Sequence, residues 1–123
     1  MALILRLIAA LTLLSGVVQT VEPGWILSMV NASVTPSTTQ TFATIGFFMA
    51  AFGGLLWQSV AREIPTGLFW SAVQKVGASS AVFIGIHRGV FSGLMAAGVA
   101  SFDGLSAILI FIYYAQLRRA LAS

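Results

Sequence analysis

Residues 94–117 read LMAAGVASFDGLSAILIFIYYAQL and contain a single charged residue, Asp103. A helix of about 20 apolar residues is long enough to cross the hydrocarbon core of a bilayer, which is about 30 Å thick. The stretch therefore predicts a transmembrane helix, which ends where Arg118 and Arg119 follow.

The composition of the whole chain points to the same class of protein. Of its 123 residues, 59% are hydrophobic and only 7% are charged, whereas about 25% of a typical soluble domain is charged. These residues cannot build a water-facing surface, so the excess apolar surface is expected to face lipid. The absence of cysteine excludes a disulfide framework, a thiolate metal site and a cysteine nucleophile.

The net charge of +3 does not indicate nucleic acid as a partner. A protein that grips a phosphate backbone carries its Lys and Arg residues in a cluster, and here they are scattered along the chain. The basic residues are Arg6, Arg62, Lys75, Arg88, Arg118 and Arg119. We expect the lipid bilayer, not nucleic acid, to be the first partner.

Four transmembrane spans are predicted, over residues 2–21, 40–60, 67–87 and 94–117, in one domain that covers residues 1–123. The fold class is thus an all-α integral membrane bundle of four helices. The first stretch also has the apolar run of a signal peptide, but Arg6 interrupts the run and no small-residue cleavage site follows it. We expect it to be retained as the first span.

The connections between the spans are short. Pro23 and Gly24 end the first span, and Trp25–Asn31 is expected to form a short amphipathic helix at the interface, with Trp25 as an anchor. Residues 31–39 are expected to form a polar turn. Residues 61–66 form a connection tight enough to make the second and third helices an antiparallel pair.

The basic residues that flank the spans predict the orientation in the membrane. Cytoplasmic loops carry the excess of Lys and Arg. With a cytoplasmic N-terminus, Arg6, Arg62 and the Arg118-Arg119 pair lie inside and only Arg88 lies outside. We therefore expect a multi-pass protein of the inner (cytoplasmic) membrane with both termini in the cytoplasm.

Small residues recur at every fourth position and predict helix contacts. In lipid, helices associate where small residues let their backbones approach closely. One such stripe lies on the second span and a longer one runs from the third span into the turn after it, and we expect the longer one to face another helix of this chain or of a partner. The predicted packing residues are Gly46, Gly54, Gly77, Ala81, Gly85, Gly89 and Gly93.

Lys75 and Asp103 are the charged residues that lie inside predicted spans, far from the ends. At about 1.5 Å of rise per residue, Lys75 lies roughly 12 Å from the inner end of the third span and Asp103 roughly 13 Å from the outer end of the fourth. Their heights in a core of about 30 Å then differ by about 5 Å, so the sequence predicts an ion pair. An intramembrane charge is also a candidate for function, as a proton or ion relay or as part of a polar ligand site.

Two further polar residues on the third span are candidates for a site. Gln74, beside Lys75, could line a narrow polar pocket or form a hydrogen bond between helices. His87 could ligate a haem iron or a chlorophyll magnesium, but it is the only histidine and lies at a helix end next to Arg88. We therefore expect no bound metal or cofactor, and an interfacial hydrogen bond for His87.

No phosphate-binding loop, HExxH or GxSxG motif is present, so an enzyme is not expected.

The order of particular residues resembles a known family. Gly16 late in the first span precedes the loop with Pro23, the second span holds Gly46 and Gly53-Gly54, the third holds Lys75-Val76-Gly77, and the fourth holds Asp103. In this layout, most of the chain resembles the small four-helix DoxX-like membrane proteins of bacteria. The resemblance implies the architecture and a bacterial membrane, but no reaction and no functional residues.

Three classes of function remain. The first is a non-catalytic accessory or structural subunit of a larger membrane complex, which fits the stripe of small residues and the lack of a catalytic motif. The second is a small oligomeric transporter or channel that uses Lys75 and Asp103. The third is a haem- or chlorophyll-binding membrane subunit that uses His87. The sequence favours the first.

Overall fold

A computed structural model of residues 1–123 contains five helices and no strands. The helices are α1 (Ala2–Val21), α2 (Pro23–Met29), α3 (Pro36–Ala61), α4 (Pro65–His87) and α5 (Gly93–Ala122). Three of them, α1, α3 and α5, are long and apolar enough to cross a membrane. Helix α4 has 23 residues, but Gln74, Lys75 and three serines in its interior make it less apolar than these three.

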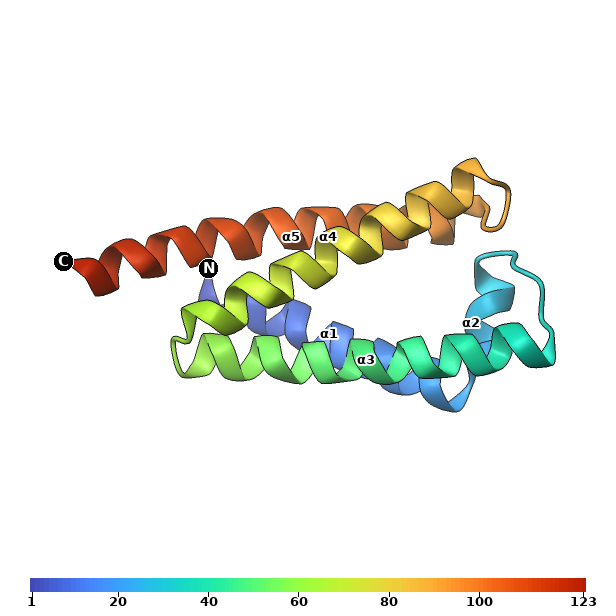
Figure 1. Cartoon of the computed structure of the whole chain (residues 1–123), viewed down its shortest axis with the longest axis horizontal. Helices are drawn as coiled ribbons and strands as arrows, with labels where there is room; N and C mark the ends of the chain where they lie inside the picture. The colour runs from blue at the N-terminus through green and yellow to red at the C-terminus, as the bar shows by residue number, and fades with distance from the viewer.

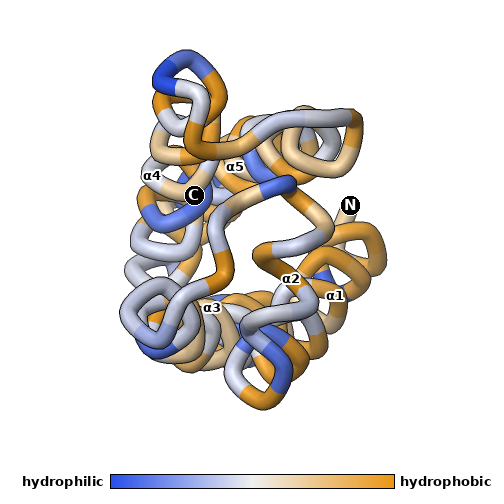
Figure 2. Tube along the Cα trace, turned by 90° about the vertical axis from the view of Figure 1, so that its right-hand side faces the viewer, coloured by the Kyte–Doolittle hydropathy of each residue, from blue (hydrophilic) through white to orange (hydrophobic).

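The long helices form two pairs, α1 with α3 and α4 with α5 (Figure 1). The turn between α3 and α4 joins the pairs at the end of the molecule where both chain termini lie. Helix α2, the loop after it and the turn between α4 and α5 lie at the opposite end. Figure 2 views the molecule from that end and shows the hydrophobic residues that follow one another along α1.

Three helices begin at a proline. Proline is favoured as the first residue of a helix, because its missing N–H would have no partner there. Helix α2 accordingly begins at Pro23 and not at Trp25, and α4 begins at Pro65. Helix α5 continues to Ala122, beyond the expected end at residue 117.

Helix α3 begins at Pro36, so the polar turn that we expected over residues 31–39 is wrong in its second half. Thr35 and Thr38 form a capping box: the Thr35 Oγ1 accepts a hydrogen bond from the Thr38 N–H at 3.1 Å, and the Thr35 N–H donates to the Thr38 Oγ1 at 2.9 Å. Reciprocal bonds of this kind satisfy backbone donors at the start of a helix. The polar residues after Thr35 therefore form the first turn of α3 and not a loop.

Glycines allow α1 and α3 to approach closely. A Cβ added to Gly16 would lie 2.6 Å from the carbonyl oxygen of Gly46, and one added to Gly46 would lie 2.8 Å from that of Gly16. A Cβ on Gly53 would lie 2.8 Å from the Cα of Leu13. Gly46 thus packs as the sequence predicts, while Gly16 and Gly53 were not among the predicted packing residues.

Other predicted packing glycines are not covered by a helix of this chain. A Cβ added to Gly54 or Gly77 would meet no atom within 4 Å, and Ala81 is exposed. The stripe on α4 therefore does not face a helix of this chain at these positions. A contact there would come from another molecule.

The rest of the stripe lies at the end of α4, in the turn after it and at the start of α5. The Phe91 ring covers Gly85, where a Cβ would clash with it. Gly89 and Gly93 have φ angles of +76° and +89°, a backbone conformation that glycine adopts without steric cost. These two glycines reverse the chain, and they do not pack against a second helix.

A hydrophobic core joins the pairs near the α3–α4 turn. It contains fully buried side chains from each of the four long helices. Among its members are Leu5, Leu56, Leu68 and Ile110. This core packs α4 and α5 against α1 and α3, and its member Ala72 lies nearly one turn before Lys75 on α4.

Candidate functional site

Lys75 of α4 and Asp103 of α5 form the one ion pair of the structure. The Lys75 Nζ donates a hydrogen bond to the Asp103 Oδ1 at 2.8 Å, and the two side chains are only 3% and 9% exposed. The contact predicted from helical rise is therefore present. A charge-assisted hydrogen bond of this length is about twice as strong as a neutral one.

Thr12 of α1 is a third member of the site, which the sequence analysis missed. The Lys75 Nζ also donates to the Thr12 Oγ1 at 2.7 Å, and that hydroxyl donates its own proton to the Ile8 carbonyl oxygen at 2.8 Å. Since the Thr12 proton is engaged within α1, its oxygen is free to accept from the ammonium. Lys75 therefore connects α4 both to α5 and to α1.

The helical rise used for the other two residues also predicts the position of Thr12. It lies ten residues after the start of α1, which is about 15 Å at 1.5 Å per residue. This height is close to that of Lys75. Threonine in an apolar helix is common, however, and only the charged residues suggested a search for partners.

An aromatic ring and a further hydrogen bond complete the surroundings of the pair. The Lys75 Nζ lies 5.2 Å from the centroid of the Phe102 ring, within the range of a cation–π contact. One turn along α4, the Ser79 Oγ donates to the Ala100 carbonyl oxygen at 2.8 Å. Helices α4 and α5 are thus held together by two polar contacts at adjacent turns.

The second carboxylate oxygen of Asp103 is not fully enclosed. This Oδ2 atom makes no hydrogen bond. Among the buried side-chain nitrogen and oxygen atoms, the Ser59 Oγ alone lacks a hydrogen-bond partner, so the Oδ2 atom is not one of the buried atoms. The Oδ2 atom therefore reaches the surface of the chain. The site offers a fixed ammonium, a hydroxyl and a carboxylate with one free oxygen, and no three potential metal ligands lie together.

The structure does not bring Gln74 or His87 to the ion pair. Gln74 is half-buried and its side chain makes no hydrogen bond to another residue. His87 is exposed at the last residue of α4, twelve residues beyond Lys75, or about 18 Å along the helix. It has no hydrogen-bond partner in this chain, so the expected interfacial bond would be to another molecule.

These features define a class of protein: an all-helical chain with helices able to cross a membrane and with one buried ion pair among them. Comparison of the chain with protein-family models, with curated proteins and with solved structures gives no match. The DoxX-like layout therefore stays a prediction from the sequence.

Proposed function

We propose that the protein is a non-catalytic accessory subunit that crosses the bacterial inner membrane four times and docks onto a larger membrane assembly. In this arrangement α4 is the fourth spanning helix and α2 lies at the outer interface. The positions of Arg6, Arg62 and Arg118 near one end of the molecule support cytoplasmic termini, because that end carries most of the basic residues.

The observation that carries the proposal is the uncovered surface of α4 at Gly77. Glycine in the interior of a helix is less favourable than alanine by about 1 kcal/mol. At Gly16, Gly46 and Gly53 the close approach of α1 and α3 accounts for that cost, but at Gly77 no atom of this chain lies within 4 Å. A helix of a partner that approaches Gly77 and Ala81 would account for it in the same way.

The buried ion pair supports a structural role for the charged residues. Lys75 donates to both Asp103 and Thr12, so its charge is neutralised and its geometry is fixed by two helices. A charge that moves an ion or proton has to change partners. Here the same contacts hold three helices in register.

The test compares substitutions on two sides of α4. Gly77→Leu with Ala81→Leu adds bulk to the uncovered surface, where the chain itself has room. Val76→Leu is the matched control, because Val76 is also exposed and lies about 100° around the helix from Gly77. Each tagged protein is extracted in mild detergent, and the proteins that co-elute with it are identified by mass spectrometry.

We expect the wild type and the Val76→Leu variant to co-elute with the same membrane protein, and the double variant to elute alone. All three should keep the same helical content. The proposal is wrong if the wild type elutes without a partner, or if the double variant retains the partner at full stoichiometry.

The second candidate function is an oligomeric transporter or channel. It is favoured by the free Oδ2 atom of Asp103, which reaches the chain surface beside a buried ammonium. Asp103→Asn keeps the size of the side chain and removes its charge. Transport that disappears in this variant while the protein still assembles would support the transporter and exclude the accessory role.

A further inference from the structure

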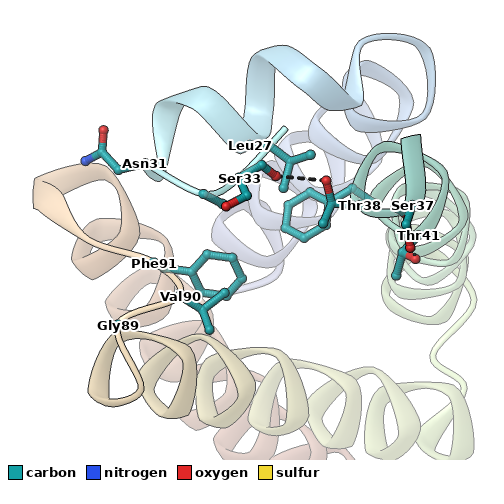
Figure 3. Close-up of a pocket in the computed structure, with 11 residues that line it drawn as sticks. Leu27, Asn31, Ser33, Ser37, Thr38, Thr41, Gly89, Val90 and Phe91 are labelled. Atoms are coloured by element: carbon teal, nitrogen blue, oxygen red, sulfur yellow. Dashed lines mark hydrogen bonds between the residues drawn. The ribbon is translucent and has the colours of Figure 1, made fainter. Parts of the chain in front are cut away.

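A cavity of about 500 Å³ lies at the end of the molecule opposite the chain termini (Figure 3). Four segments surround it: α2, the loop after α2, the first two turns of α3, and the turn between α4 and α5. Its volume falls in the range of about 300–1,000 Å³ that is typical of small-molecule sites. The buried ion pair lies elsewhere, since Lys75 is 14 residues, or about 21 Å, before Gly89 on the cavity wall.

Hydrogen bonds join two of the segments that line the cavity. The Ser92 N–H donates to the Val30 carbonyl oxygen at 2.9 Å, and the Asn31 Nδ2 donates to the Ser92 carbonyl oxygen at 3.2 Å. The Val90 and Phe91 N–H groups both donate to the Gly85 carbonyl oxygen, at 2.8 and 3.2 Å. Two segments about 60 residues apart in sequence are thus fixed to each other, and the cavity is formed without a ligand.

Hydroxyl groups from the loop after α2 and from α3 line the cavity. The Ser33 and Ser37 side chains make no hydrogen bond within the chain, and the Thr41 Oγ1 donates to the Ser37 carbonyl oxygen at 2.9 Å and keeps its lone pairs. In Figure 3, Ser33 points from its loop toward the space between α3 and the α4–α5 turn, whereas Asn31 points away toward Ser92. Two free hydroxyl donors and several acceptors are therefore available among the residues that line the cavity.

Apolar side chains from α2, α3 and the α4–α5 turn also line the cavity. Leu27 is buried, and the Phe42 and Phe91 rings meet with their centroids 6.0 Å apart. No residue that lines the cavity is charged. A charged headgroup would find no counter-ion here, whereas an uncharged head with hydroxyl or ester oxygens could bond to the serines and place its apolar part on the rings.

We propose that this cavity binds the uncharged glycerol head of a neutral glycerolipid, with diacylglycerol as the simplest example. The inference rests on the membrane embedding proposed above but not on a partner subunit. Helix α1 ends at Val21 and α3 begins at Pro36, so the cavity lies where these two apolar helices end. At that level a lipid places its glycerol backbone next to its acyl chains.

The test uses a diacylglycerol with a photoreactive group near the head of one acyl chain, incorporated in nanodiscs with the purified protein. Thr41→Phe fills the cavity from α3. Thr44→Phe is the matched control, because Thr44 lies nearly one turn further along α3, is exposed, and makes the same kind of hydrogen bond, to the Gln40 carbonyl oxygen at 3.1 Å. Mass spectrometry locates the labelled residues.

We expect labels near Phe42 and Phe91 in the wild type and in Thr44→Phe, and a loss of at least tenfold in Thr41→Phe. The double variant Ser33→Ala with Ser37→Ala should fold as the wild type does and bind the probe about 4- to 100-fold more weakly, because each of the two lost hydrogen bonds contributes about twofold to tenfold to the binding constant. Co-elution with a partner should be the same in all of these variants, so a failure here differs from a failure of the proposed accessory role.

Three results would overturn the proposal. One is labelling that persists unchanged in Thr41→Phe or in the double serine variant. Another is competition by free glycerol at the concentration at which unlabelled diacylglycerol competes, which would make the ligand a soluble polyol. The last is equal competition by phosphatidic acid, which would show that the cavity does not select an uncharged head.

Discussion

Replacement of Asp103 by leucine removes the carboxylate that accepts from Lys75 and leaves the ammonium with Thr12 as its hydrogen-bonding partner. Because the Lys75 side chain is 3% exposed and that of Asp103 is 9% exposed, solvent screens the pair only weakly. Loss of one partner of a buried ion pair is expected to lower the free energy of unfolding by about 3–5 kcal/mol. That is a large part of the roughly 5–15 kcal/mol by which a typical protein is stable.

Lys75→Met should have a similar cost, because it leaves the carboxylate without its cation. The double variant Lys75→Met with Asp103→Leu contains no buried charge, and replacement of a complete pair by apolar residues is often neutral or stabilising by about 1–4 kcal/mol. We therefore expect the double variant to be more stable than either single variant. The coupling free energy between the two positions should exceed about 3 kcal/mol.

The assay is reversible unfolding by sodium dodecyl sulfate in mixed micelles, followed by circular dichroism and by the fluorescence of the three tryptophans. Ser79→Ala is the matched control: it removes one α4–α5 hydrogen bond and should cost about 0.5–1.5 kcal/mol. If the effects of the single substitutions at residues 75 and 103 add to within about 0.5 kcal/mol in the double variant, the pair does not stabilise the fold as argued.

Three further predictions use the same unfolding assay. Gly16→Leu should lower the free energy of unfolding by about 1–3 kcal/mol or more, because the leucine side chain would overlap the α3 backbone. Gly54→Leu should change this free energy by less than about 0.5 kcal/mol. Equal effects of the two substitutions would contradict the assigned helix packing. Thr12→Val should cost about 1.5–3 kcal/mol through the lost hydrogen bond to the ammonium, and a value near zero would exclude Thr12 from the site. Thr35→Ala should cost about 1 kcal/mol and shorten α3 at its start, which hydrogen exchange at Thr38 would detect; unchanged protection there would refute the capping box.

The sequence predicts the positions of the long helices well, because apolar length and helix-starting or helix-ending residues decide them. Helix α1 has the bounds expected from the run between Met1 and Glu22, and the other three long helices differ from the predicted ranges mainly at their ends. The error at the start of α3 has a specific cause. Its first turn is polar, and only the Thr35–Thr38 spacing distinguishes a capped helix start from a loop.

Helical rise was enough to pair Lys75 with Asp103, because two charges in apolar surroundings have few alternatives. Small-residue spacing was not enough to identify helix contacts. The spacing describes the surface of one helix and contains no information on what covers it, so Gly46 and Gly77 look alike in the sequence. In the structure the first meets the α1 backbone, and the second meets nothing within 4 Å.

The arrangement of the four long helices explains why Lys75 matters more than its one salt bridge suggests. The Gln19 side chain bonds within the α1–α3 pair, to the Phe42 carbonyl oxygen, and Ser79 bonds within the α4–α5 pair. The Lys75–Thr12 bond is the only side-chain hydrogen bond between the bodies of the long helices of the two pairs. Between the α3–α4 turn at one end and the Asn31–Ser92 contact at the other, this bond is therefore the side-chain hydrogen bond that joins the two pairs. Loss of this bond would leave the apolar core near the α3–α4 turn and the Asn31–Ser92 contact as the connections between the pairs.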